Sequence, residues 1–169
     1  MTPSIRTAVP ADAPALAAAE AETAKTPGLL VSRPHELMPA AFEKTIRELA
    51  SRGRYVVAEE GDIVVGHALL EPMGLEASAH VHRLTIVVHA GHRGRGVGRA
   101  LMEDLMRWAR ETPAVGKVEL LVRATNAPAI ALYQSLGFVE EGRFRRRVRL
   151  PDGSFVDDVA MAWFPRQNG

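Results

Sequence analysis

The chain has 169 residues and a mass of 18.3 kDa, with 21 basic and 20 acidic residues and a net charge of +1. This length suits one domain, residues 1–169, and the balanced charge argues neither for nor against nucleic acid. The chain has no cysteine, which excludes disulfides, a thiolate nucleophile and Cys-ligated metals, and we expect no metal site. It contains no apolar run of the roughly 18 residues that span a membrane, and its first residues lack signal-peptide features, so we expect a cytoplasmic protein without a membrane partner.

The first part of the chain predicts a strand, a helix, a loop and a second helix. Helix-forming residues follow the first strand, and Asp12 is placed to cap that helix. The loop contains three prolines and a glycine, and is interpreted as a substrate lid or a connector. Gly53 closes the second helix. The expected elements are strand 4–9, helix 10–24, loop 25–39 and helix 40–53.

The rest of the chain predicts an antiparallel meander, a βαβ unit, a helix and a hairpin. The expected elements are strands 54–60, 62–72 and 80–89, helix 97–111, strand 117–124, helix 126–137 and hairpin 144–164. The strands of the βαβ unit should be parallel, with a right-handed crossover. The sequence therefore predicts a mixed α/β (α+β) fold, with one mostly antiparallel sheet and helices on both faces.

A glycine-rich stretch, HRGRGVGRAL, occupies residues 92–101, between a strand and a helix. Amides in the first turn of a helix lack intrahelical acceptors, and the helix dipole favours an anion there. The glycines at 94, 96 and 98 remove every Cβ that would hold a pyrophosphate away from those amides. Arg93, Arg95 and Arg99 add positive charge, so the stretch predicts a phosphate site.

Two common phosphate motifs fit poorly. A Walker loop needs a lysine followed by a hydroxyl residue, which is missing here. The dinucleotide fingerprint would need glycine in place of Arg99, and the preceding strands form a meander. A third pattern, Arg/Gln-x-x-Gly-x-Gly/Ala, fits residues 93–98.

A second segment, NAPAIALYQSLGF at residues 126–138, supplies an asparagine, a helix with a tyrosine, and Gly-Phe. With both segments in place, the chain closely resembles the GNAT family, the GCN-related N-acetyltransferases, over nearly its whole length. The resemblance implies that acetyl-CoA is the co-substrate and that two parallel strands splay apart to admit it. The implied acetyl-CoA contacts are Ile86, Val88, Arg93, Gly94, Arg95, Gly96, Val97, Gly98, Arg99, Asn126 and Tyr133.

The resemblance also implies catalytic roles. Tyr133 matches the family tyrosine that protonates the departing thiolate, although its helical spacing also suits a core aromatic residue. The Val88 amide is a candidate donor to the acetyl carbonyl. Relatives often carry an acidic residue at the position of Arg83, which leaves the base open. His80 and His82 share one face of the predicted strand, so His82 is a candidate base, although a structural histidine is the alternative.

The arginine-rich stretch RFRRRVR at residues 143–149 resembles a nucleic-acid patch, but it has no interleaved aromatic residue beyond Phe144. Four of its arginines should share one strand face, which favours a solvated face or a contact with an acidic substrate over a nucleic-acid partner.

The acceptor is expected to be a small-molecule amine, because the loop and the C-terminal hairpin resemble the branch of the family that acetylates free amino acids. Acetyltransferases of protein N-termini, ribosomal proteins or polyamines have similar hairpins and remain an alternative. A non-catalytic acyl-CoA-binding module is the rival class, against which Tyr133 argues. A homodimer is expected, since strand edges and the hairpin offer pairing surfaces.

Overall fold

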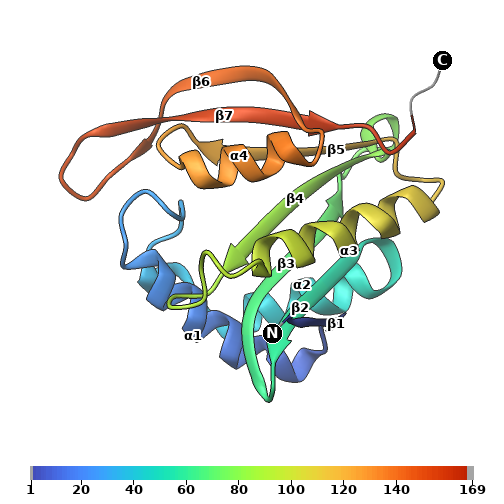
Figure 1. Cartoon of the computed structure of the whole chain (residues 1–169), viewed down its shortest axis with the longest axis horizontal. Coiled ribbons are helices and arrows are strands. Elements are labelled where there is room, and N and C mark those ends of the chain that lie inside the picture. Colours follow the sequence, from blue (N-terminus) through green and yellow to red (C-terminus); the bar gives the residue numbers. More distant parts are fainter. Residues whose placement is uncertain (1, 167–169) are drawn as a thin grey trace.

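The structure is a computed structural model that describes residues 2–166. Seven strands form one mixed sheet in the order β1-β2-β3-β4-β5-β7-β6, with helices on both faces (Figure 1). The main elements are β1 (Ser4–Thr7), α1 (Ala13–Ala24), α2 (Pro39–Arg52), β2 (Arg54–Glu60), β3 (Ile63–Pro72), β4 (Val81–Val88), α3 (Val97–Glu111), β5 (Lys117–Arg123), α4 (Ala127–Ser135), β6 (Val139–Arg149) and β7 (Phe155–Trp163). Three 3-10 turns add η1 (Pro10–Asp12), η2 (Pro34–Glu36) and η3 (Glu76–Ser78). The predicted fold class is confirmed.

The sheet opens between β4 and β5. Strands β2 to β4 form the predicted antiparallel meander, β1 pairs antiparallel with β2, and β4 and β5 are parallel. Their pairing ends after the three pairs Val81–Lys117, His82–Val118 and Arg83–Glu119. Beyond Arg83 the two strands diverge (Figure 1), which leaves one edge of β4 without a strand partner in the part of the chain that the structure describes.

Two apolar clusters cover the two faces of the sheet. The larger cluster joins α3 and α4 to one face, with the fully buried Leu101 and Leu105 of α3 at its centre. The smaller cluster joins α1 and α2 to the other face, through residues such as Leu16 and Leu49. The larger cluster includes residues of both diverging strands, such as Leu84 and Leu120, whereas the smaller cluster packs on β2 and β3.

Of the two helix-end residues singled out in the sequence, Gly53 acts as predicted and Asp12 does not. Asp12 makes no hydrogen bond to the N-terminus of α1. Its carboxylate accepts the Val9 amide at 2.8 Å and pairs with Arg6 at 2.8 Å, so it stabilises the turn η1 instead. Gly53 does end α2, in an extended conformation: a Cβ there would lie 2.4 Å from the Leu70 carbonyl oxygen.

The C-terminal hairpin inserts β7 between β5 and β6. Between Phe144 and Val148 the register of β6 shifts against β7, and Arg146 adopts a φ of 52°. Regular strand alternation is lost there, so the predicted single arginine face is wrong. No helix among residues 2–166 is long and apolar enough to cross a membrane.

Candidate active site

The glycine-rich loop leads into the N-terminus of α3. Gly94 and Gly96 have φ values of 70° and 83°, and a Cβ on either would meet no atom within 4 Å. They are therefore required for the left-handed backbone and leave open space above it. Gly98 differs, because a Cβ there would lie 3.3 Å from Leu132 Cδ2. Gly98 thus lets α3 approach α4, a packing role in place of the predicted clearance for pyrophosphate.

A cavity of about 820 Å³ lies against this loop. It is lined by every predicted acetyl-CoA residue except Arg95. The guanidinium of Arg95 pairs with Glu60 at 2.8 Å and lies 3.3 Å from the His92 ring, so its side chain anchors the loop. We call this space the donor cavity.

Two predicted residues of the donor cavity also connect structural elements. Arg99 Nη2 donates to Ser135 Oγ at 2.9 Å, which ties α3 to α4. Asn126 is the N-cap of α4, and its side-chain oxygen accepts the Ala129 amide at 3.4 Å. These contacts fix the positions of α3 and α4, whose N-termini both face the donor cavity. Such an arrangement favours the binding of anionic groups.

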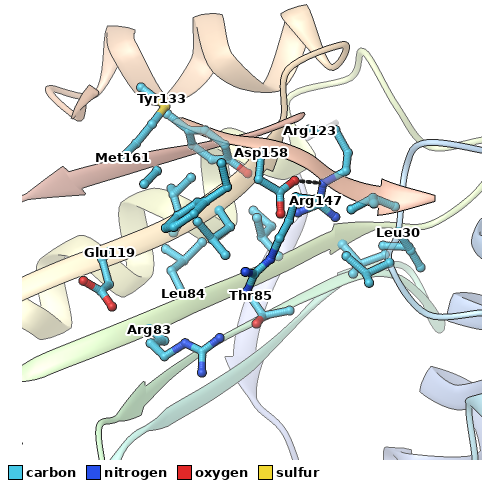
Figure 2. Close-up of a pocket in the computed structure, with 18 of the residues that line it drawn as sticks. Leu30, Arg83, Leu84, Thr85, Glu119, Arg123, Tyr133, Arg147, Asp158 and Met161 are labelled. Carbon is cyan, nitrogen blue, oxygen red and sulfur yellow. Dashed lines mark hydrogen bonds and ion pairs between the residues drawn. The ribbon is translucent and has the colours of Figure 1, made fainter. Parts of the chain in front are cut away.

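A second cavity, of about 840 Å³, occupies the opening between β4 and β5 (Figure 2). It is lined by side chains from both strands, from β6 and β7, from α1 and from the loop after α1. The two cavities share Leu29, Leu30, Ile86, Val87 and Tyr133. We call the second space the acceptor cavity, because it meets the donor cavity at Tyr133 and β4.

Tyr133 extends from α4 toward the buried pair Arg123–Asp158 (Figure 2). It is 7% exposed, and its ring packs against Phe138 at a centroid distance of 5.9 Å. Burial raises the pKa of its hydroxyl to about 12, although the nearby Arg123 opposes the shift. Tyr133 is therefore protonated at neutral pH and can donate a proton at the junction of the cavities.

Charges in the acceptor cavity are unevenly paired. Its carboxylates have cationic or histidine partners: Asp158 pairs with Arg123, Glu119 and Glu141 with Lys117, Glu71 with Arg52, and Glu20 with His67. Arg83 and Arg147, by contrast, form no ion pair with any residue between 2 and 166. The guanidinium of Arg147 lies over the Phe144 ring at 5.2 Å and extends from β6 toward β4 (Figure 2). The cavity can therefore receive an anionic group.

The structure does not bring His82 to either cavity. His82 is 3% exposed on the α3 face of the sheet, with its ring 6.1 Å from that of Trp108. Burial lowers its pKa, and its Nδ1 has no hydrogen-bond partner. His80 precedes β4 and packs beside Gly116. The predicted shared face is absent, and His82 is too enclosed to meet an acceptor.

Sequence reasoning missed Glu20, which lines the acceptor cavity from α1. Its Oε1 lies 2.7 Å from Nε2 of the fully buried His67, whose Nδ1 lies 2.9 Å from His89 Nε2. A signal was present, because Glu20 follows the buried Leu16 by four residues and so shares its helix face. The partner histidines could not be identified from that spacing.

Comparisons with known proteins define the class. The model of the acetyltransferase (GNAT) family matches residues 17–138. The chain belongs to the GNAT family and is an N-acetyltransferase. Among residues 2–166 there is no group of three or more His, Cys, Asp or Glu side chains that could hold a metal.

Two relatives show how the family's activities divide. N-alpha-acetyltransferase RimI of Mycobacterium tuberculosis is 41% identical over 113 residues, which cover 66% of this chain and 67% of that protein. L-amino acid N-acetyltransferase AaaT of Escherichia coli is 35% identical over 107 residues, 63% of this chain and 65% of that protein. The alignments thus span about two thirds of each relative. The structure of yncA from Salmonella typhimurium, solved with its cofactor acetyl-CoA, shares the fold with a TM-score of 0.89 at 20% identity, over 100% of this chain and 97% of that one.

Proposed function

We propose that this protein transfers the acetyl group of acetyl-CoA to the primary amine of a small molecule that carries a carboxylate, such as a free amino acid. The observation that carries the proposal is the junction of the two cavities at Tyr133. A donor thioester from one side and an amine from the other would meet beside a protonated hydroxyl. Direct attack of the amine on the thioester needs this proximity and an acid for the leaving thiolate.

The donor side has groups suited to each part of acetyl-CoA. The amides of residues 93–99 would bind the pyrophosphate at the N-terminus of α3. Beyond Arg83, β4 has an edge without a strand partner, and Ile86 and Val88 on it would hydrogen-bond the extended pantetheine arm as an added strand would. The Val88 amide would donate to the acetyl carbonyl, and Tyr133 would protonate the departing thiolate.

The acceptor side supports a carboxylate-bearing substrate. Arg83 and Arg147 are cations without carboxylate partners among the described residues, and they line a cavity whose own carboxylates are paired. A guanidinium binds a carboxylate through two parallel hydrogen bonds. The relative AaaT, an L-amino acid N-acetyltransferase, agrees with this choice, whereas RimI favours the protein N-terminus as the second candidate.

Thiol release from acetyl-CoA should be measured with amino acids, their carboxamides, polyamines and peptides with free N-termini. We expect amino acids to be acetylated faster than their carboxamides. The substitution Arg147→Gln should abolish that preference, while Arg145→Gln, a neighbour on β6 that does not line the cavity, should preserve it. Faster turnover of peptides than of every small amine would favour the protein N-terminus. Binding of acetyl-CoA without turnover of any amine would show a non-catalytic module.

The proposal includes a homodimer. The sheet ends in β1 on one side and the eleven-residue β6 on the other, and either edge can pair with a second copy. Light scattering coupled to size-exclusion chromatography would give the mass in solution, and a monomer at micromolar concentration would contradict this part.

A further inference from the structure

Three side chains from three elements form a hydrogen-bonded row that ends at the acceptor cavity. Glu20 of α1 contacts His67 of β3, and His67 contacts His89, just after β4. His89 Nδ1 lies 3.1 Å from the carbonyl oxygen of Val64. His67 and His89 are 0% and 5% exposed, whereas the Glu20 side chain is 12% exposed and lines the cavity.

The Val64 carbonyl determines where the protons in this row lie. A carbonyl oxygen can only accept, so His89 carries its proton on Nδ1 and accepts at Nε2. His67 must then donate from Nδ1, which leaves its Nε2 facing Glu20. That last contact can hold one proton, as imidazolium with carboxylate or as imidazole with carboxylic acid. Without the proton, two acceptors would face each other at 2.7 Å, so the geometry of the Glu20–His67 pair suits it to receive one.

Among residues 2–166, Glu20 and His67 form an ion pair with each other and with no other side chain. The Tyr55 ring of β2 stacks on His67 at 6.0 Å, and Phe42 of α2 packs edge-on at 6.2 Å. Burial raises the pKa of Tyr55 above its usual value, and Glu20 and Asp12 raise it further, so its hydroxyl stays neutral. Burial, followed by His67, lowers the pKa of His89 to about 4, with a smaller effect of His92, so His89 is neutral at assay pH. Glu20 and His67 therefore form the contact of the row that can hold an exchangeable proton.

The row also lies close to the junction of the two cavities. In the sheet His67 pairs with Val87, and Val87 lines both cavities. Glu20, which contacts His67, lines the acceptor cavity together with Val87. An amine in position to attack at the junction would therefore have a carboxylate beside it.

We propose that Glu20 is the general base of the reaction and that His67 and His89 are positioning residues that orient Glu20 and share the proton it accepts. This inference rests on the acetyltransferase function proposed above and supplies the base for which His82 was the candidate. An amine enters as an ammonium ion and cannot attack until it loses a proton.

The protons balance as follows. The first ammonium proton passes to the Glu20–His67 pair. The nitrogen then bonds to the acetyl carbon, the bond from that carbon to the CoA sulfur breaks, and Tyr133 protonates the thiolate. The second proton leaves the new amide nitrogen for solvent, from which Tyr133 recovers its own. Solvent finally removes the first proton from Glu20.

The test compares Glu20→Gln with Glu22→Gln, the same change two residues away on α1, where Glu22 is 59% exposed and outside both cavities. Two acceptors are used: the amine that the wild-type enzyme acetylates fastest, and its aminooxy analogue, whose nitrogen is unprotonated at neutral pH. The readouts are kcat/KM from pH 5.5 to 9.5 and the Kd of acetyl-CoA.

For Glu20→Gln we expect kcat/KM for the amine to fall by roughly 10²-fold or more at pH 7. The loss should shrink as the pH rises toward the pKa of the amine, and the aminooxy analogue should lose less than about threefold. The acetyl-CoA Kd should not change, and Glu22→Gln should behave as wild type. His67→Gln should retain activity but move the acidic limb of the profile to lower pH, because Glu20 would then act without the imidazole.

An equal loss for both acceptors at every pH would overturn the inference, since it would indicate a structural role. An unchanged pH profile in Glu20→Gln would overturn it as well. If that variant does not fold, Glu20→Asp replaces it, with the same selective loss expected for the amine. Failure of the wild-type enzyme to acetylate any amine would instead refute the proposed function.

Discussion

Arg123 of β5 and Asp158 of β7 form an ion pair whose side chains are only 8% and 2% exposed. They are directly opposed in the sheet, beside Tyr133 in the acceptor cavity. Removing one partner of a buried pair leaves an uncompensated charge, so Asp158→Asn should lower the free energy of unfolding by about 3–5 kcal/mol. Urea unfolding measures the change. The double variant Arg123→Met with Asp158→Leu should recover most of the loss, and a single variant as stable as wild type would contradict this account.

Tyr133→Phe removes the hydroxyl and keeps the ring that packs on Phe138. We expect kcat to fall by roughly 10²–10⁴-fold, as is typical when a general acid is lost. Because the ring contacts persist, the acetyl-CoA Kd from calorimetry should change by less than about threefold. An unchanged kcat, under conditions where product release is shown not to limit the rate, would remove the assigned role.

The loop glycines offer a matched comparison, since Gly91 and Gly96 both have a φ of 83° and a Cβ on either would meet no atom within 4 Å. Only Gly96 lines the donor cavity. Alanine should strain the backbone at each by about 1–2 kcal/mol. Gly96→Ala should also weaken acetyl-CoA binding by at least about tenfold, whereas Gly91→Ala should not. Equal affinity in the two variants would show that the loop does not bind the pyrophosphate.

His89 should make the fold sensitive to acid. Burial lowers its pKa from 6.5 to about 4, so the unfolded chain binds the proton more tightly than the folded one. The stabilisation from neutral His89 is therefore complete above pH 6.5 and is lost as the pH falls toward 4. The midpoint of urea unfolding should decrease over this range. His89→Asn retains a donor for Val64 and should flatten the decrease, whereas replacement of His35, which lies outside the buried core, should leave it unchanged.

Periodicity and motifs were sufficient to predict most of the fold, for identifiable reasons. The spacing of Val97, Leu101 and Leu105 marks the buried face of α3, and all three are buried in the structure. The resemblance to the family predicted the splayed strands, and all of the acetyl-CoA residues that it implied except Arg95 line the donor cavity. The position of β7 between β5 and β6 was not predictable, because a hairpin pairs the same way whichever of its strands joins the sheet.

The acceptor side was harder to predict because its contacts cross the sequence. Glu20 and His67 are 47 positions apart, and His67 and His89 are 22 apart. Strand alternation can predict that the His67 side chain is buried on one face of the sheet, but it does not predict which helix residue contacts it. His82 lies on a strand with the same alternation as the strand of His67, but it packs against Trp108 on the opposite face of the sheet. Whether a given histidine can contribute to the active site therefore depends on which face of the sheet each helix covers.

Leu29 and Leu30 line both cavities. The loop that carries them contacts the C-terminal hairpin, because Arg33 Nη2 donates a hydrogen bond to the Arg149 carbonyl oxygen at 3.1 Å. A ligand in either cavity therefore restricts the same two leucines that the other ligand must contact. We therefore expect the two binding equilibria to be coupled through this loop. The coupling would be reciprocal: whatever factor acetyl-CoA applies to the affinity for the acceptor, the acceptor applies to the affinity for acetyl-CoA.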